Sequence, residues 1–418
     1  MLEGGPTTIF LSGKRGVVSD TQFRGEVEPC DNVRRAVRGA KAQGSSRLAI
    51  QKPQIRIDEG GGTVLTFEPG DRKTPCTIQY KDSETAFGGN TYNTAVAYQT
   101  TLEAFDTYGA HIASTIFHTE IVSRALRDEL EKVFGDRQFT MPQPPVREPM
   151  RLGWYLPEEK PKSGANEHFY LSHTPQHAPI NYDLPGTKLR GKTYVISSTE
   201  PNSKEWKQLI EAKNQDQTAE IVVSPGRNQM GLDLEREVLE KVDLIAFNMR
   251  EAKDFLGRVN PRLLAYVENE GKNGISNYEI AKLLAKAVCI MGPRSALVTN
   301  GGYSVAFYDA QADQLTSVDP PRVLDLQDLI RQSIGKTLPD QEVSFIGCGD
   351  TLLGVFLALQ KLEKSRQIPF STQEQLQIAV NIARYHGWSS KPNIQYLGAG
   401  EFQKIADHSA KHVTSIEA

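Results

Sequence analysis

The stretch SFIGCGDTLLG, Ser344–Gly354, places two glycines and an aspartate directly before the apolar run TLLGVFLAL. A glycine turn that opens a helix presents backbone N–H groups and the positive end of the helix dipole, and glycine lets an anion approach closely. The pattern therefore predicts an anion-binding turn at residues 347–350, followed by a buried helix. Asp350 is then either a cap that complements the dipole or a proton acceptor beside the anion.

Two further segments carry polar residues at expected helix starts. In AFGGNTYNTAVA (86–97) a diglycine opens a helix. Asn93 lies one turn inside that helix, where it either binds ligand hydroxyls or serves local structure. In VDLIAFNMREAKDFLG (242–257) a buried strand precedes a helix whose first turn carries Asn248 and Glu251. This pair either holds a hydrated Mg²⁺ ion beside phosphates or forms a capping box.

A fourth segment, SALVTNGGYSVAFY (295–308), has two strand-like runs joined by a glycine turn. A glycine turn at the end of a strand either receives a nucleotide or closes a plain hairpin. Taken alone, each of the four segments has a structural explanation, so the prediction of function depends on their combination.

Short apolar, β-branched runs recur along the chain and predict strands. Several are almost continuously apolar, as in strands buried on both faces of a largely parallel sheet. The runs are 7–11, 63–67, 193–197, 220–224, 242–247, 295–299 and 303–308. Helical apolar spacing follows or precedes most of them, at 93–105, 121–135, 203–213, 278–288 and 374–388. This alternation predicts a layered α/β fold.

Two segments interrupt the alternation. Residues 13–60 are polar and rich in glycine, and residues 141–187 are rich in proline, so we expect neither in the core. The second contains strand-like pieces that predict a small accessory sheet covering a cleft. We therefore expect residues 1–62 to form an extension or a first strand with a polar insertion. A main domain should span 63–400, and 401–418 should form a tail helix.

The composition argues against several classes of protein. A net charge of -3 over 418 residues gives no electrostatic footprint for nucleic acid or an anionic membrane, so we take the locally basic stretch 34–47 as a solvated helix face. The longest apolar run is too short to span a bilayer, and a cytoplasmic location is expected. The four cysteines form no CxxC pair, which is typical of reduced thiols, and the paired histidines are interpreted as surface residues.

In this order the four segments resemble the ribokinase-like (PfkB) family of carbohydrate kinases, over about residues 63–390. The family pairs a diglycine with an asparagine, an N-x-x-E element, a T-x-G turn and a late G-A-G-D. The corresponding residues are Gly88, Gly89 and Asn93; Asn248 and Glu251; Thr299 and Gly301; and Gly347, Cys348, Gly349 and Asp350. The resemblance implies a three-layer αβα sandwich with a mainly parallel central sheet and a small β lid.

The resemblance also implies a reaction, the transfer of the ATP γ-phosphoryl group to a hydroxyl of a sugar or sugar-like molecule. On that expectation Asp350 takes the hydroxyl proton, and the amides of 347–350 stabilise charge on the transferred group. The N-x-x-E pair would order Mg²⁺ and its waters, the diglycine and Asn93 would hold the acceptor, and the T-x-G turn would lie along the nucleotide. A homodimer through the lid is a further implication.

The chain departs from the family pattern at several positions. Cys348 replaces an alanine, and serine stands where the family usually carries an acid or a glycine, at Ser224, Ser304 and Ser344. No first-strand acid is evident; the candidates are Asp20, Glu68 and Asp71. Two alternative functions stay open because of these departures, the polar 13–60 segment and the long 309–343 connection. One is a catalytically inactive, kinase-like binding module, and the other is a nucleoside or vitamin-alcohol kinase.

Overall fold

In the part of the chain that the structure describes, two β-sheets organise the protein, one of eight strands and one of seven. The structure is a computed structural model. It describes residues 7–12, 18–24, 31–42, 47–57, 63–69, 75–80, 82–105, 114–118, 124–134, 150–154, 169–173, 193–197, 204–225, 236–272, 276–301, 303–338, 347–365, 368–388 and 394–417.

The eight-stranded sheet has the order β15-β14-β13-β12-β11-β10-β1-β7. Its strands are β1 (Thr7–Ser12), β7 (Ser114–His118), β10 (Thr193–Ser197), β11 (Glu220–Ser224), β12 (Leu244–Asn248), β13 (Ser295–Thr299), β14 (Val305–Asp309) and β15 (Gln314–Val318). From β13 to β7 all neighbours pair parallel, whereas β14 and β15 are added antiparallel at one edge. The expected mainly parallel central sheet is confirmed.

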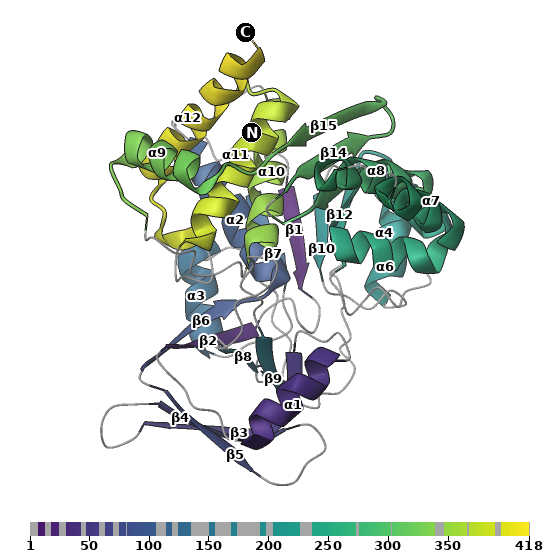
Figure 1. Ribbon diagram of the computed structural model, residues 1–418. Coiled ribbons are helices and arrows are strands. Elements are labelled where there is room, and N and C mark those ends of the chain that lie inside the picture. The colour runs from purple at the N-terminus through teal and green to yellow at the C-terminus, as the bar shows by residue number, and fades with distance from the viewer. Residues whose placement is uncertain are drawn as a thin grey trace.

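Helices cover both faces of this sheet and complete three layers (Figure 1). One face carries α2 (Asn90–Phe105), α3 (Arg124–Phe134), α9 (Val323–Ile334), α10 (Cys348–Lys364), α11 (Thr372–Gly387) and α12 (Ala399–Glu417). The other carries α4 (Lys204–Gln215), α5 (Arg236–Leu239), α6 (Met249–Val259), α7 (Pro261–Lys272) and α8 (Asn277–Ile290). In β11, Val222 packs with the helices on the first of these faces, whereas Ile221 and Val223 pack with the helices on the other. Because both faces of the strand are buried, its sequence is continuously apolar.

The seven-stranded sheet has the order β5-β4-β3-β9-β8-β2-β6. Its strands are β2 (Val18–Arg24), β3 (Arg47–Ile57), β4 (Thr63–Pro69), β5 (Cys76–Tyr80), β6 (Asp82–Gly88), β8 (Met150–Trp154) and β9 (Phe169–His173). Helix α1 (Asp31–Ala42) packs on it, and the pair lies below the central sheet in Figure 1. The sheet has its own small hydrophobic core, separate from the two cores of the central sheet.

This second sheet differs from the small accessory sheet expected within 141–187. Only β8 and β9 come from that range, and the other five strands come from residues 18–88. The boundary expected after residue 62 falls between β3 and β4, which pair antiparallel. The run 63–67 therefore belongs to the second sheet and not to the parallel one, because its partners are β3 and β5.

Residues 13–60 also contribute core, contrary to expectation. Val33 and Val37, one turn apart on α1, and Ile50 on β3 are almost fully buried. The segment is polar on average because each of these elements buries only one face. The basic residues Arg35 and Arg38 are exposed on α1, as a solvated helix face requires.

The described part of the 309–343 connection contains β15 and α9. The helix expected at the C-terminal end is present as α12, and its Phe402, Ile405 and Ala406 are buried in the same core as α2 and α10. Within the described residues, none of the helices combines the length and the apolar character that crossing a bilayer would take.

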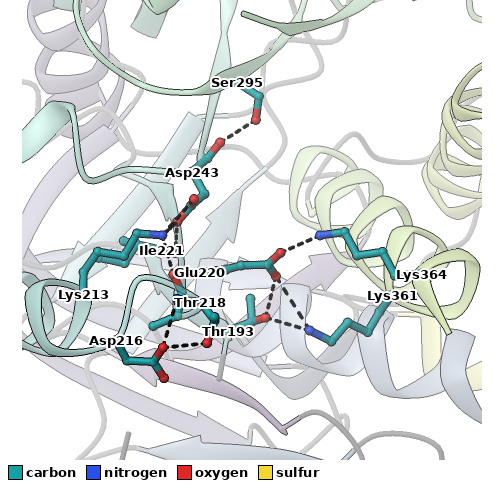
Figure 2. A network of polar contacts seen from close by, with 11 residues as sticks. Thr193, Lys213, Asp216, Thr218, Glu220, Ile221, Asp243, Ser295, Lys361 and Lys364 are labelled. Carbon is teal, nitrogen blue, oxygen red and sulfur yellow. Dashed lines mark hydrogen bonds and ion pairs between the residues drawn. The ribbon is translucent and has the colours of Figure 1, made fainter. Parts of the chain in front are cut away.

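A polar network ties the last turns of α10 to the amino-terminal ends of two strands (Figure 2). Lys364 Nζ lies 2.5 Å from Glu220 Oε1, and Lys361 Nζ lies 3.7 Å from Glu220 Oε2. Thr193 Oγ1 donates to Glu220 at 2.8 Å and accepts from Lys361 at 3.1 Å. Burial acts to raise the pKa of Glu220, but Lys364, Lys361 and Thr193 outweigh it and lower the pKa to about 2.

This lowered pKa predicts an acid-sensitive contribution to stability. Since the ordinary pKa is 4.5, the contribution is fully present above about pH 4.5 and is lost as the pH falls toward 2. Glu220→Gln should therefore reduce the free energy of unfolding by about 1–3 kcal/mol at pH 7 and by much less at pH 3. Thermal unfolding of both proteins at the two pH values measures the difference.

The control is Glu240→Gln, which breaks the exposed pair that Glu240 forms with Arg236 within one helical turn. An exposed pair of this kind contributes about 0–1 kcal/mol, so this variant should unfold almost like the wild type at both pH values. An effect of Glu220→Gln that is equal at pH 7 and pH 3 would contradict the assignment of a depressed carboxyl pKa.

Candidate active site

The carboxyl-terminal ends of the parallel strands bring two of the predicted segments together. Asn248 ends β12 and Thr299 ends β13, and the two residues are direct register partners. The turn after Thr299 and the helix after Asn248 therefore begin side by side at one edge of the sheet. In open α/β sheets this edge is where ligands bind.

The anion turn predicted from the sequence opens α10. Gly347 is the N-cap residue and has φ 75° and ψ −2°, a left-handed conformation that favours glycine. The first intrahelical bond is donated by Thr351 N to Gly347 O at 2.7 Å, so Cys348, Gly349 and Asp350 form the first turn. Cys348 and Asp350 are half-buried and Gly349 is exposed, with open space where a Cβ would lie. The turn is accessible, while residues 351–359 of the helix are buried in the core.

The diglycine segment lies at the junction of the two sheets. Gly88 ends β6, Gly89 has φ 107°, and α2 begins at the next residue. Asn93 N donates to Gly89 O at 2.8 Å. The Asn93 side chain is only 1% exposed, and within the described part of the chain neither its Oδ1 nor its Nδ2 has a hydrogen-bond partner. A buried amide without partners is rare in folded proteins and calls for a specific explanation, of which a role in binding or catalysis is one.

Helices α2 and α10 pack so closely that the first two segments become neighbours. A Cβ on Gly354 would lie 2.3 Å from Thr94 O and 2.7 Å from the Cβ of Ala97, so only glycine allows this approach. Gly354 lies in the segment SFIGCGDTLLG, but the sequence alone predicted no role for it. Its signal was a glycine inside an apolar helical run, which often marks close packing.

The two helices run in the same direction, toward the amino-terminal edge of the sheet. Tyr98 of α2 contacts Thr8 at 2.8 Å, and Lys361 of α10 reaches Thr193, the register partner of Thr8. The helices approach each other at Gly354, closer to their beginnings than these contacts. Both helix N-termini therefore lie toward the carboxyl-terminal edge, the edge that carries Asn248 and Thr299.

The pair Asn248 and Glu251 forms the capping box that was one of its two interpretations. Asn248 Oδ1 accepts from Glu251 N at 2.9 Å, and Glu251 Oε2 accepts from Asn248 N at 2.9 Å. This box orients both side chains at the start of α6. Their oxygens are of the type that Mg²⁺ prefers, so a capping role and a role beside a hydrated ion are compatible.

The Thr299–Gly301 turn closes an antiparallel hairpin between β13 and β14. Asn300 N donates to Ser304 O at 2.8 Å, and Ser304 is fully buried. Gly301 is exposed with nothing near its Cβ position, which leaves that side of the turn open. The hairpin interpretation is confirmed, and the nucleotide role remains a proposal.

The candidate first-strand acids and the substituted serines are the remaining residues singled out from the sequence. Of the three possible first-strand acids, Glu68 pairs with Lys52 at 2.9 Å, Asp20 lies on β2, and Asp71 falls outside the described residues, as does Ser344. Ser224 ends β11 and is half-buried at the same carboxyl-terminal edge. Among the residues that the structure describes, no group of three or more His, Cys, Asp or Glu side chains is placed to hold a metal ion.

No model of a known protein family matches the chain, and no curated protein sequence matches it. Solved structures do match it over nearly its whole length. Ribokinase from Cryptococcus neoformans var. grubii serotype A, in complex with ADP, covers 98% of this chain and 99% of its own, with 11% identity and a TM-score of 0.54.

Two further solved structures are also similar to this chain, and each match covers 97% of this chain and 99% of the other chain. Ribokinase from Arabidopsis thaliana, complexed with ribose and ATP, has 13% identity and a TM-score of 0.51. A single-residue variant of phosphofructokinase-2 from Escherichia coli has 15% identity and a TM-score of 0.51. Identities of this size establish likeness of fold, and the chain therefore has the ribokinase-like fold that its motifs led us to expect.

Proposed function

We propose that this protein is an ATP-dependent kinase that phosphorylates a hydroxyl of a sugar or sugar-like molecule. The observation that carries the proposal is the packing of the glycine-opened start of α10 beside α2, whose first turn buries the unpartnered amide of Asn93. An anion-binding turn and an amide suited to hydroxyls then lie at the same edge of the sheet. Phosphoryl transfer requires this combination, because it depends on positioning and charge stabilisation.

In the proposed reaction Asp350 accepts the proton of the acceptor hydroxyl. The hydroxyl oxygen forms a bond to the γ-phosphorus of ATP, the bond from that phosphorus to the bridging oxygen breaks, and ADP leaves with the electron pair. The backbone N–H groups of 347–350 would stabilise the charge on the transferred group. Mg²⁺, when bound, would neutralise phosphate charge, and Asn248 and Glu251 are the residues that would hold its water shell.

The second sheet is the proposed lid over the acceptor. Its strand β6 runs directly into Gly89 and α2, so a movement of the sheet would act on the residues proposed to hold the acceptor. Closure over a phosphoryl-transfer site excludes water that would otherwise accept the phosphate. We also propose the edge of this sheet as the surface through which two copies would pair.

The proposed substrates agree with what the similar structures contain, namely ribose and ATP in one ribokinase and ADP in another. The alternative of an inactive binding module has lost two of its three arguments. Residues 13–60 and 309–343, taken as departures, contain regular helices and strands. The substituted serines still favour it, and a nucleoside or vitamin alcohol as acceptor is the second alternative.

The experiment that tests the function measures ADP formation from MgATP across a panel of sugars, sugar phosphates, nucleosides and vitamin alcohols. A kinase of the proposed class should show ADP formation that depends on one sugar-like acceptor, with a phosphorylated product detected by mass spectrometry. Acceptor-dependent turnover with nucleosides alone would move the proposal to the second alternative. A folded protein that binds nucleotide but turns over no acceptor would support the binding module.

Asn93 gives a prediction in which stability and function change in opposite directions. Asn93→Leu replaces a buried, unpartnered amide by an apolar group of similar size, so it should raise the free energy of unfolding by about 1–2 kcal/mol. The same change removes the amide proposed to bind the acceptor and should raise the acceptor KM at least tenfold. Thermal unfolding and initial-rate kinetics measure the two effects.

The matched control is Asn381→Leu on α11. Asn381 is also buried, at 2% exposed, but its Oδ1 accepts from Gln377 and its Nδ2 donates to Ser409, each at 2.9 Å. Its replacement leaves that hydroxyl with one partner fewer and should lower stability without changing the acceptor KM. A loss of stability in Asn93→Leu similar to that in Asn381→Leu would show that the Asn93 amide serves structure.

A further inference from the structure

The last turns of α10 are held at the opposite edge of the sheet from the anion turn. Lys361 lies 11 residues after Asp350, about 16 Å along the helix axis at 1.5 Å per residue. Figure 2 shows Lys361 and Lys364 reaching Glu220 and Thr193, the first residues of β11 and β10. Glu220 therefore receives contacts from one helix and from the neighbouring strand, and its carboxylate fixes their separation.

A straight helix transmits an axial shift from one end to the other. Near its beginning α10 touches α2 through Gly354, which sets the distance between the helices, and apolar side chains such as Leu353 and Phe356 pack in the same core without directional contacts. The hydrogen bonds that Lys361 donates to Thr193 at 3.1 Å and Lys364 donates to Glu220 at 2.5 Å are directional, unlike the apolar packing of the helix. They therefore help to set the position of α10 along its axis and its rotation. A shift of about 1 Å at this end would move the anion turn by a similar distance.

We propose that Glu220 and Lys361 are positioning residues, which set the place of the residue 347–350 turn relative to the acceptor through the axis of α10. The inference rests on the proposed kinase function. A displacement of about 1 Å in a phosphoryl-transfer site costs about 10²-fold in rate, so the effect falls on kcat more than on binding.

Burial and charge favour positioning over a contribution to stability alone. The side chains of Lys361 and Glu220 are 14% and 30% exposed, and burial lowers the pKa of Lys361 despite the nearby carboxylate. A buried ion pair adds little net stability, because desolvation offsets the attraction. Its directional contacts nevertheless define one geometry, which an apolar pair of the same size would not.

The chain provides a matched control on the same sheet. Lys213 and Asp243 form a pair of similar burial, with 14% and 19% exposed side chains and a distance of 2.7 Å. Asp243 also accepts from Ile221 N, and Lys213 also donates to Ala219 O, so this pair joins α4, β11 and β12. Both pairs appear in Figure 2, and only the Glu220 pair touches α10.

The experiment compares Glu220→Gln, Lys361→Met, their double variant and Asp243→Asn by steady-state kinetics, at a temperature where all four are folded. We expect kcat to fall tenfold to a hundredfold in the three variants at the α10 end, with both KM values within about threefold of the wild type. Asp243→Asn should keep kcat within twofold. The double variant removes both charges of the less exposed pair and leaves only the exposed Lys364 without Glu220, so it should recover most of the stability while its kcat stays low.

Recovery of kcat together with stability in the double variant, or an equal loss in Asp243→Asn, would overturn the inference. If the wild type turns over no acceptor, the proposed function fails, and a second measurement still decides the inference. The rate at which iodoacetamide alkylates Cys348, followed by peptide mass spectrometry, reports the geometry of the turn. A change of threefold or more in the double variant but not in Asp243→Asn supports positioning, and equal rates in all variants contradict it.

Discussion

Replacing Asp350 by asparagine is expected to lower kcat for phosphoryl transfer by about 10²–10⁴-fold, the usual contribution of a positioned general base. Asp350 is half-buried in the first turn of α10, next to the exposed Gly349. In the proposed reaction its carboxylate accepts the proton of the acceptor hydroxyl. Asparagine keeps the size and polarity of the side chain but accepts no proton. Binding of MgATP and of the acceptor should change little, and initial-rate kinetics with equilibrium binding separates the two effects.

Asp325 is a matched control for the helix-dipole explanation of Asp350. It occupies the third position of α9 after the N-cap Arg322, as Asp350 does in α10 after Gly347, and it is exposed. A carboxylate at such a position stabilises a helix by about 0.3–1 kcal/mol. Asp325→Asn should therefore lose only this amount and no turnover. If Asp350→Asn behaves in the same way and keeps full kcat, Asp350 is a cap and not a base.

Gly354→Ala is expected to have the largest effect on stability. The new Cβ would lie 2.3 Å from Thr94 O and 3.0 Å from Tyr98 N, and these backbone atoms belong to a buried helix that cannot yield locally. Helices α2 and α10 would have to separate, at a cost of about 1–3 kcal/mol or more for an overpacked core. The separation would also move the anion turn away from Asn93, so kcat should fall in the fraction that remains folded.

Gly400→Ala is the matched control for this substitution. Gly400 lies in α12, and nothing is found within 4 Å of the position of its Cβ. Alanine is a better helix former than glycine, so this variant should be as stable as the wild type or slightly more stable. Chemical denaturation of the two variants gives the comparison. A Gly354→Ala protein of wild-type stability would mean that α2 and α10 do not pack as closely as described.

The sequence was sufficient to predict many strands and helix starts of the central domain. Residues 193–197, 220–224 and 295–299 were predicted as strands and are strands with the same bounds, because strands buried on both faces must be apolar throughout. The helix starts with Asn93, Asn248 and Asp350 were also predicted, because capping residues and glycine turns have local causes. The order of these elements led to the ribokinase-like fold.

The strand pairing of the second sheet could not be predicted from local sequence patterns. Its strands come from both sides of α2, and the pairing of β2 with β8 joins residues about 130 positions apart. Each strand buries one face against a small core, so the sequence of 13–60 is polar on average and resembled an insertion. Pairing partners at such distances depend on the completed fold and not on the periodicity of one segment.

The sequence by itself determined the type of each buried strand and helix and the chemistry of the candidate residues, because both depend on short-range spacing and side-chain type. The tertiary structure alone decided which of those residues meet. It placed Asn248 beside Thr299 through strand register, and it packed α2, which carries Asn93, against α10, which carries the 347–350 turn, through the contact at Gly354. It also decided the pairing of Glu220 with Lys361, because register and helix packing are set by contacts between segments distant in the chain.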